Sequence, residues 1–114
     1  MEKLLTIDGR RVKFKSTGAF LLRYKAQTGR DALRDIVKLQ NVADDKGQFT
    51  NIDALDLGVF YDLVWVLAKT GDPNIPPPFE WLDTFSEFPL LDILPQVMDM
   101  VTSCLGSTVT SKKK

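Results

Sequence analysis

Residues 57–88 constrain the fold more than any other stretch, because they combine an almost wholly apolar segment, a run of prolines and a second aromatic segment. From 57 to 70 the only charged residues are Asp62 and Lys69. A helix that is apolar on most sides is buried centrally or covered by another chain. The prolines at 76–78 force an extended segment that has little conformational freedom to lose. We therefore expect a central helix, a rigid joint and a short helix beside it.

The same stretch holds both tryptophans and most of the other aromatic residues of the chain. Large aromatic side chains usually pack in a core. Trp and Tyr are also favoured where proteins bind one another, so a few of these residues are candidates for an interface. The residues that we predict as partner-binding are Phe60, Tyr61, Trp65, Trp81 and Phe85.

The N-terminal segment predicts a β-hairpin over residues 3–15. Asp8-Gly9 favours a tight turn because Gly accepts positive φ, and apolar residues alternate with lysines after it. A two-stranded ribbon is marginally stable alone, so its apolar face must lie on helices.

Two helices are predicted next. Ser16 or Thr17 can cap the first, Gly29 is well placed to end it in a left-handed conformation, and Asp31 can cap the second. An i, i+3, i+4 pattern predicts the buried stripe of the second helix. This stripe consists of Leu33, Ile36, Val37 and Leu39–Gln40.

A polar loop is predicted over 43–51, after which Asp53 or Asp56 opens the central helix. That helix is expected to end at Thr70-Gly71.

Two further helices are predicted after the prolines, a short one over 79–87 and a final one over 90–105. Pro89 separates them, and Pro95 is expected to kink or restart the second. The sequence thus predicts one domain, residues 1–106, of the α+β class and predominantly α-helical, with an N-terminal β-hairpin packed on four to five helices. Residues 107–114 are predicted to be a flexible polar tail.

Catalytic and metal-binding patterns are missing from the sequence. There is no histidine, which removes the commonest general base, and the single cysteine cannot form a zinc or iron site. Neither of the glycine-rich motifs that bind phosphate groups, GxxxxGK(S/T) and GxGxxG, occurs in the sequence. We therefore predict a protein that is not an enzyme and that has no cofactor.

Charge is unevenly distributed although the net charge is zero. Residues 1–30 carry eight Lys/Arg against two Asp/Glu, a net of +6, whereas residues 31–111 carry four against thirteen, a net of −9. Such asymmetry steers partners or favours self-association into a homo-oligomer. It also leaves open a nucleic-acid-binding module that uses the basic face of residues 10–30, although the pI of about 6.2 argues against nucleic acid as the partner.

The cellular compartment is suggested by two features. A lone Cys104 fits a reducing cytoplasm, and the N-terminus has no apolar segment typical of a signal peptide. The longest apolar tract is too short to span a bilayer, so no membrane association is expected.

Three motifs lie in segments 14–39 and 60–85. They are the Arg-Tyr-Lys-Ala-Gln-x-Gly-Arg-Asp run at 23–31, the Trp-Val-Leu-Ala-Lys-Thr run at 65–70, and an Asp-Pro-x-Ile-Pro-Pro-Pro joint leading into Glu80-Trp81-Leu82. With these motifs the sequence resembles the tail assembly chaperones of long-tailed phages and prophages of Gram-positive bacteria. None of the three motifs is a catalytic fingerprint.

This resemblance implies a small, mostly helical protein that is made in the infected cell. Such proteins bind the long tape measure protein and keep it soluble until tail-tube subunits polymerise around it. The resemblance therefore implies a location in the host cell cytoplasm and absence from the mature virion. A minor structural protein of the tail remains a further alternative.

The lysine run at 112–114 suggests one more feature. The resembling family often makes a longer second product by ribosomal frameshifting near the end of the first gene. Lysine codons are adenine-rich, as many slippery sites are, so codons 111–114 are predicted to carry or adjoin such a site. The extension would recruit the tail-tube protein through the flexible tail.

Overall fold

The chain begins with an antiparallel β-hairpin formed by β1 (Glu2–Ile7) and β2 (Arg10–Lys15). Asp8 and Gly9 make its two-residue turn with φ values of 53° and 77°. Positive φ at both central residues is the conformation that matches the twist of paired strands. The Asp8-Gly9 signal therefore predicted the hairpin correctly.

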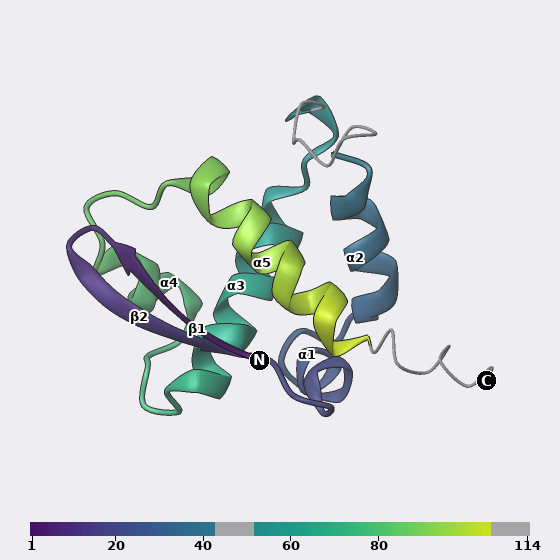
Figure 1. Cartoon of the computed structure of the whole chain (residues 1–114), viewed down its shortest axis with the longest axis horizontal. Coiled ribbons are helices and arrows are strands. Elements are labelled where there is room, and N and C mark those ends of the chain that lie inside the picture. The colour runs from purple at the N-terminus through teal and green to yellow at the C-terminus, as the bar shows by residue number, and fades with distance from the viewer. Residues whose placement is uncertain (43–51, 106–114) are drawn as a thin grey trace.

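Helices make up most of the remainder of the computed structural model, which describes residues 1–42 and 52–105 (Figure 1). They are α1 (Phe20–Thr28), α2 (Ala32–Gln40), a single 3₁₀ turn at Ile52–Ala54, α3 (Leu57–Gly71), α4 (Pro78–Asp83) and α5 (Leu90–Cys104). The predicted α+β class, dominated by helix, is confirmed. The predicted loop at 43–51 and tail at 107–114 lie outside the described residues.

Helix α3 is the centre of the fold and contacts β2 and the four other α-helices. In Figure 1 the hairpin and α4 lie at one end of the molecule, α2 lies at the other, and α5 crosses in front of α3. Lys3 of β1 ties the hairpin to α5, because its Nζ donates to Gln96 Oε1 at 2.8 Å and pairs with Asp99 at 2.8 Å. Most apolar side chains of α3 are buried within the chain, whereas Leu57 at its first position is 52% exposed.

Local capping signals set several helix ends as predicted. Gly29 ends α1 at φ 77° and donates its N–H to Lys25. Asp31 caps α2 through Leu33 N–H, and Asp56 caps α3 through Val59 N–H. Of the two alternatives for the start of α3, Asp56 is therefore the cap. Helix α5 runs through Pro95 without interruption.

The predicted side-chain cap of α1 is wrong. The N-cap is Ala19, which offers no side-chain hydrogen bond. Thr17 instead accepts from Ala19 N–H before the helix begins, and Ser16 is buried beside the hairpin. The physical reason is that the backbone of Ser16 pairs with Met1 and so continues the hairpin.

The predicted helix at 79–87 is too long, because α4 ends at Asp83. Thr84 Oγ1 donates to the Trp81 carbonyl oxygen at 2.6 Å, and the N–H groups of Thr84 and Phe85 bond three residues back. Ser86 N–H then donates to Asp8 Oδ2 at 2.7 Å, across to the hairpin turn. These contacts with a distant part of the chain draw the backbone out of the helix.

The predicted buried stripe of α2 is wrong at three positions. Ile36 and Leu39 are buried, but Leu33 is 50% exposed, Val37 is 55% exposed and Gln40 is exposed as well. The remaining buried positions of α2 are taken by Ala32 and Asp35. The helix is therefore turned so that part of its apolar surface stays outside the core.

Candidate functional site

The five aromatic residues predicted to bind a partner do not form an exposed surface. Phe60, Trp65, Trp81 and Phe85 are buried, and Tyr61 is half-buried. Ring centroids lie 5.2 Å apart for Phe60–Tyr61 and 5.2 Å apart for Trp81–Phe85. Edge-to-face pairs of this kind stabilise a core. In this conformation these side chains hold α4 and the segment after it against α3.

Trp65 has a second structural role at the proline joint, which we define as residues 72–78. Its indole Nε1 donates to the Pro76 carbonyl oxygen at 3.0 Å. Lys69, one turn later on α3, donates to the carbonyl oxygens of Pro73 and Ile75 at 2.7 and 3.1 Å. The joint is thereby fixed to α3 through its backbone carbonyl oxygens, and Asp72 N–H adds a bond to the Ala68 carbonyl oxygen of α3.

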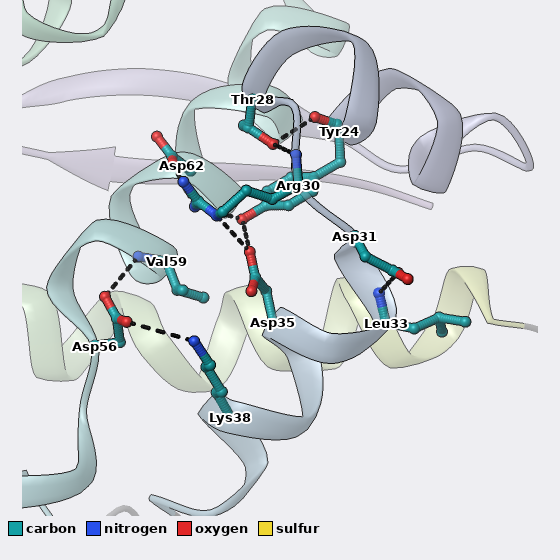
Figure 2. Close-up of polar contacts among 10 residues, drawn as sticks. All are labelled: Tyr24, Thr28, Arg30, Asp31, Leu33, Asp35, Lys38, Asp56, Val59 and Asp62. Carbon is teal, nitrogen blue, oxygen red and sulfur yellow. Dashed lines mark hydrogen bonds and ion pairs between the residues drawn. The ribbon is translucent and has the colours of Figure 1, made fainter.

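Several apolar residues other than the five predicted ones are exposed in the structure, and they lie on other elements. Phe79, the second residue of α4, is 85% exposed although Trp81 beside it is buried. Leu33 and Val37 lie one turn apart on α2, and Figure 2 shows Leu33 extending away from Asp35 and Arg30. Further exposed apolar residues are scattered over the surface: Met1, Leu4, Leu22, Leu57, Leu91 and Leu105.

We define the α2 face as Leu33 and Val37. Residues four apart on a helix are neighbours, so these two side chains form one continuous apolar strip. The opposite flank of α2 carries Lys38, which reaches Asp56 at the start of α3 (Figure 2). The α2 face is thus directed away from α3 and is available to another molecule.

A polar cluster around the buried Asp35 fixes the position of α2. Tyr24 OH on α1 donates to Asp35 Oδ2 at 2.6 Å, and Arg30 Nε donates to the same oxygen at 2.9 Å. Arg30 Nη2 also donates to Tyr24 OH and to Asp62 on α3 (Figure 2). Charge-assisted hydrogen bonds are stronger than neutral ones, and here they hold the buried Asp35 carboxylate while the Arg30 side chain stays 42% exposed.

Ionisation within this cluster follows from these contacts. Burial, together with the Asp35 carboxylate, raises the pKa of Tyr24. Burial alone would raise the pKa of Asp35, but the hydrogen bonds from Tyr24 and Arg30, with the charges of Arg30 and Lys38, outweigh it and lower the pKa. The hydrogen bonds from Arg30 to Asp35 and Asp62 raise the pKa of the guanidinium. The cluster therefore holds a neutral tyrosine, a carboxylate and a cation near neutral pH.

The basic residues at 10–30 do not gather into one patch. Arg10 lies over the Phe85 ring at 3.7 Å, and Arg30 belongs to the polar cluster. Lys13 and Lys15 both reach Glu2, at 3.5 and 3.8 Å. Much of the positive charge therefore has a structural partner within the domain.

Cofactor and membrane signals are also lacking in residues 1–42 and 52–105. No group of three or more His, Cys, Asp or Glu side chains there could hold a metal ion. The half-buried Cys104 thiol donates to the Val101 carbonyl oxygen, and burial raises its pKa. None of the described helices has the length and apolar character needed to cross a membrane.

Comparison of the chain with protein-family models, curated protein sequences and solved structures finds no match.

Proposed function

We propose that this chain is a tail assembly chaperone that binds the tape measure protein of a long-tailed phage in the host cytoplasm and keeps it soluble during tail morphogenesis. The observation that carries the proposal is the α2 face, where Leu33 and Val37 stay half exposed on a helix held by hydrogen bonds to the buried Asp35 carboxylate. The sequence resemblance described above supplies the class of partner.

The α2 face suits a helical partner. An amphipathic helix presents apolar residues at i, i+3 and i+4, and a strip of two residues one turn apart matches that spacing. Full burial of an exposed aliphatic side chain contributes about 1.5–3 kcal/mol, so the half-exposed pair would contribute a modest affinity. Modest affinity suits a chaperone that must release its client when tube subunits arrive.

The motifs that carry the resemblance lie in the scaffold that holds α2 and the proline joint. The 23–31 run supplies Tyr24 and Arg30 to the polar cluster, and Asp31 to the cap of α2. The 65–70 run lies in α3 and supplies Trp65, which holds the joint. Their role here is to position α2 and the joint, which accords with a binding protein.

Co-expression with a tape measure protein tests the proposal. Leu33→Asp removes half of the α2 face, and an acidic residue in the first turn of a helix does not disturb the helix dipole. The soluble yield of tape measure should fall to that obtained without this chain. Leu4→Asp is the matched control, because Leu4 is an exposed leucine on β1 rather than on α2, and it should preserve the yield.

Three results would contradict the proposal. The first is an unchanged tape measure yield with Leu33→Asp when circular dichroism shows the variant is folded. The second is equal yield with and without this chain. The third is recovery of this chain in purified virions, which would indicate a minor structural protein of the tail.

The proposed frameshift is tested separately by the nucleotide sequence of codons 111–114. A slippery adenine-rich heptamer that overlaps a downstream frame would support a longer form able to recruit the tail-tube protein. Mixed lysine codons without such a frame would refute it.

A further inference from the structure

An open cleft of about 480 Å³ lies between β2 and the proline joint. Residues 10–13 of β2 line one side, and residues 71, 72 and 74–76 line another. Ala68, Trp81, Thr84 and Phe85 complete the lining. Figure 1 shows the hairpin, the end of α3 and α4 together at this end of the molecule, away from α2.

The outer edge of β2 opens onto this cleft at Arg11. Met1 and Ser16 exchange both backbone hydrogen bonds, at 2.9 and 3.0 Å. Along an antiparallel hairpin, opposite residues alternate between hydrogen-bonded and non-hydrogen-bonded pairs. Counted from the hydrogen-bonded pair of Met1 and Ser16, the pair of Thr6 and Arg11 is a non-hydrogen-bonded one. The backbone N–H and C=O of Arg11 therefore point outward from the hairpin.

Lys13, the next residue with an outward backbone, is covered by α3. Its carbonyl carbon lies only 3.0 Å from the position that a Cβ on Gly71 would take. Along the part of β2 that lines the cleft, Arg11 is thus the position whose backbone groups remain accessible. An exposed edge of this kind is a template for an added strand.

Positive charge surrounds the open position. The Arg10 guanidinium is used within the domain, over Phe85 and in a 2.7 Å hydrogen bond to Thr84 Oγ1. Arg11 makes no ion pair among the described residues, and Lys13 makes only an exposed one of 3.5 Å, which is weak in water. The acidic lining residue Asp72 already accepts from Asn74 N–H.

A nucleic acid is a poor fit to this cleft. Single strands bind by stacking bases on exposed aromatic faces along a continuous basic groove. Here Trp81 is buried and Arg10 covers the face of Phe85. Two available cations on a short strand cannot follow a phosphate backbone, whereas an extended peptide can use both the strand edge and the charge.

We infer that the cleft binds an extended, acidic segment of a protein partner. The segment adds to the edge of β2 at Arg11 and directs its carboxylates toward Arg11 and Lys13. Its alternate, apolar side chains lie against Ile75 and the joint. This site is separate from the α2 face, so the inference holds or fails independently of the proposed chaperone function.

A fluorescein-labelled octapeptide of alternating glutamate and valine is a suitable probe, titrated against the full chain by fluorescence anisotropy. We expect saturable binding that Arg11→Glu/Lys13→Glu weakens by about tenfold or more. The matched control is Arg23→Glu/Lys25→Glu, which changes the net charge equally at two exposed positions of α1. The control should change the affinity by less than about twofold.

A second measurement locates the peptide without any variant. Amide NMR signals of Arg11 and the indole N–H signal of Trp81 should shift on titration, while those of Leu33 and Val37 should not.

Four results would overturn the inference. They are equal weakening by both double variants, equal binding of the peptide with glutamine in place of glutamate, NMR shifts confined to other elements, and tighter binding of a twelve-nucleotide oligothymidylate that the Arg11→Glu/Lys13→Glu pair abolishes. The last result would indicate a nucleic-acid site.

Discussion

The carbonyl oxygen of Lys13 occupies the space that a side chain on Gly71 would need. Here the last residue of α3 packs directly on the backbone of β2, the strand that α3 contacts most extensively. Ordinarily alanine is favoured over glycine in a helix by about 1 kcal/mol. At this position the steric conflict is with backbone, which cannot move aside as a flexible side chain could.

Gly71→Ala should therefore lower the free energy of unfolding, by about 1–3 kcal/mol, as overpacking typically does. Urea denaturation followed by circular dichroism measures this change. Gly18→Ala is the matched control, since a Cβ at Gly18 meets nothing within 4 Å, and it should be neutral. A Gly71→Ala protein as stable as the wild type would show that the contact between α3 and β2 is looser than described.

Tyr24→Phe should destabilise the domain by about 1–3 kcal/mol. The substitution removes one of the two donors to Asp35 Oδ2 and leaves Arg30 Nε as the other. The Asp35 side chain is only 3% exposed, so water cannot readily replace the lost hydrogen bond. Chemical denaturation provides the measurement. Tyr61→Phe serves as the control, because the hydroxyl of half-buried Tyr61 has no hydrogen-bond partner among the described residues. Equal effects of the two substitutions would exclude a special role for the Tyr24–Asp35 bond.

Stability should decline in acid partly because of Asp35. Its pKa is lowered in the folded state, so its contribution is complete above the ordinary aspartate pKa of about 3.9 and is lost as the pH falls through the lower folded pKa. Asp35→Asn should be less stable than wild type at pH 6, and the difference should shrink below about pH 4. The measurement is the urea midpoint as a function of pH. A gap of constant size would mean that the carboxylate charge does not contribute.

Truncation to alanine should change the free energy of unfolding little at Phe79 and greatly at Trp81, although the two residues are only two positions apart on α4. Phe79→Ala should change the free energy of unfolding by less than about 0.5 kcal/mol, because this side chain is largely in water. Trp81→Ala should cost about 3–5 kcal/mol through the cavity it leaves beside Phe85 and Phe88. Thermal denaturation compares them. A large loss with Phe79→Ala would require a contact that the structure does not show.

The parts of the fold that the sequence predicted correctly depend on local chemistry. The Asp8-Gly9 turn, the Gly29 stop and the Asp31 cap each act on backbone groups within a few residues. The free energy that such a signal contributes depends on neighbouring residues and not on the rest of the chain, so it can be predicted from the local sequence. The central position of α3 was also predictable, because an apolar circumference can be stable only when covered on all sides.

The errors concern contacts between distant segments. Whether Leu33 or Asp35 faces the core depends on where Tyr24 and Arg30 place their polar groups, which no periodicity encodes. The length of α4 depends on Asp8, at the far end of the sequence. The partner-binding role of the five aromatic residues stays a prediction. Four of them are buried in this structure and Tyr61 is half-buried, a division between core and surface that composition alone does not give.

The bridge from Lys3 to Gln96 and Asp99 has a consequence for how the chain folds during synthesis. The hydrogen bond joins residues 93 positions apart. A hairpin can form within microseconds of leaving the ribosome, but contacts of such separation must wait for the whole intervening chain. The hairpin therefore remains undocked from α5 while most of the polypeptide is being translated. Strand β2 can pack on α3 once that helix has been made, whereas Lys3 lacks Gln96 and Asp99 until α5 emerges. A shortened translation product that ends before α5 would lack this bridge permanently.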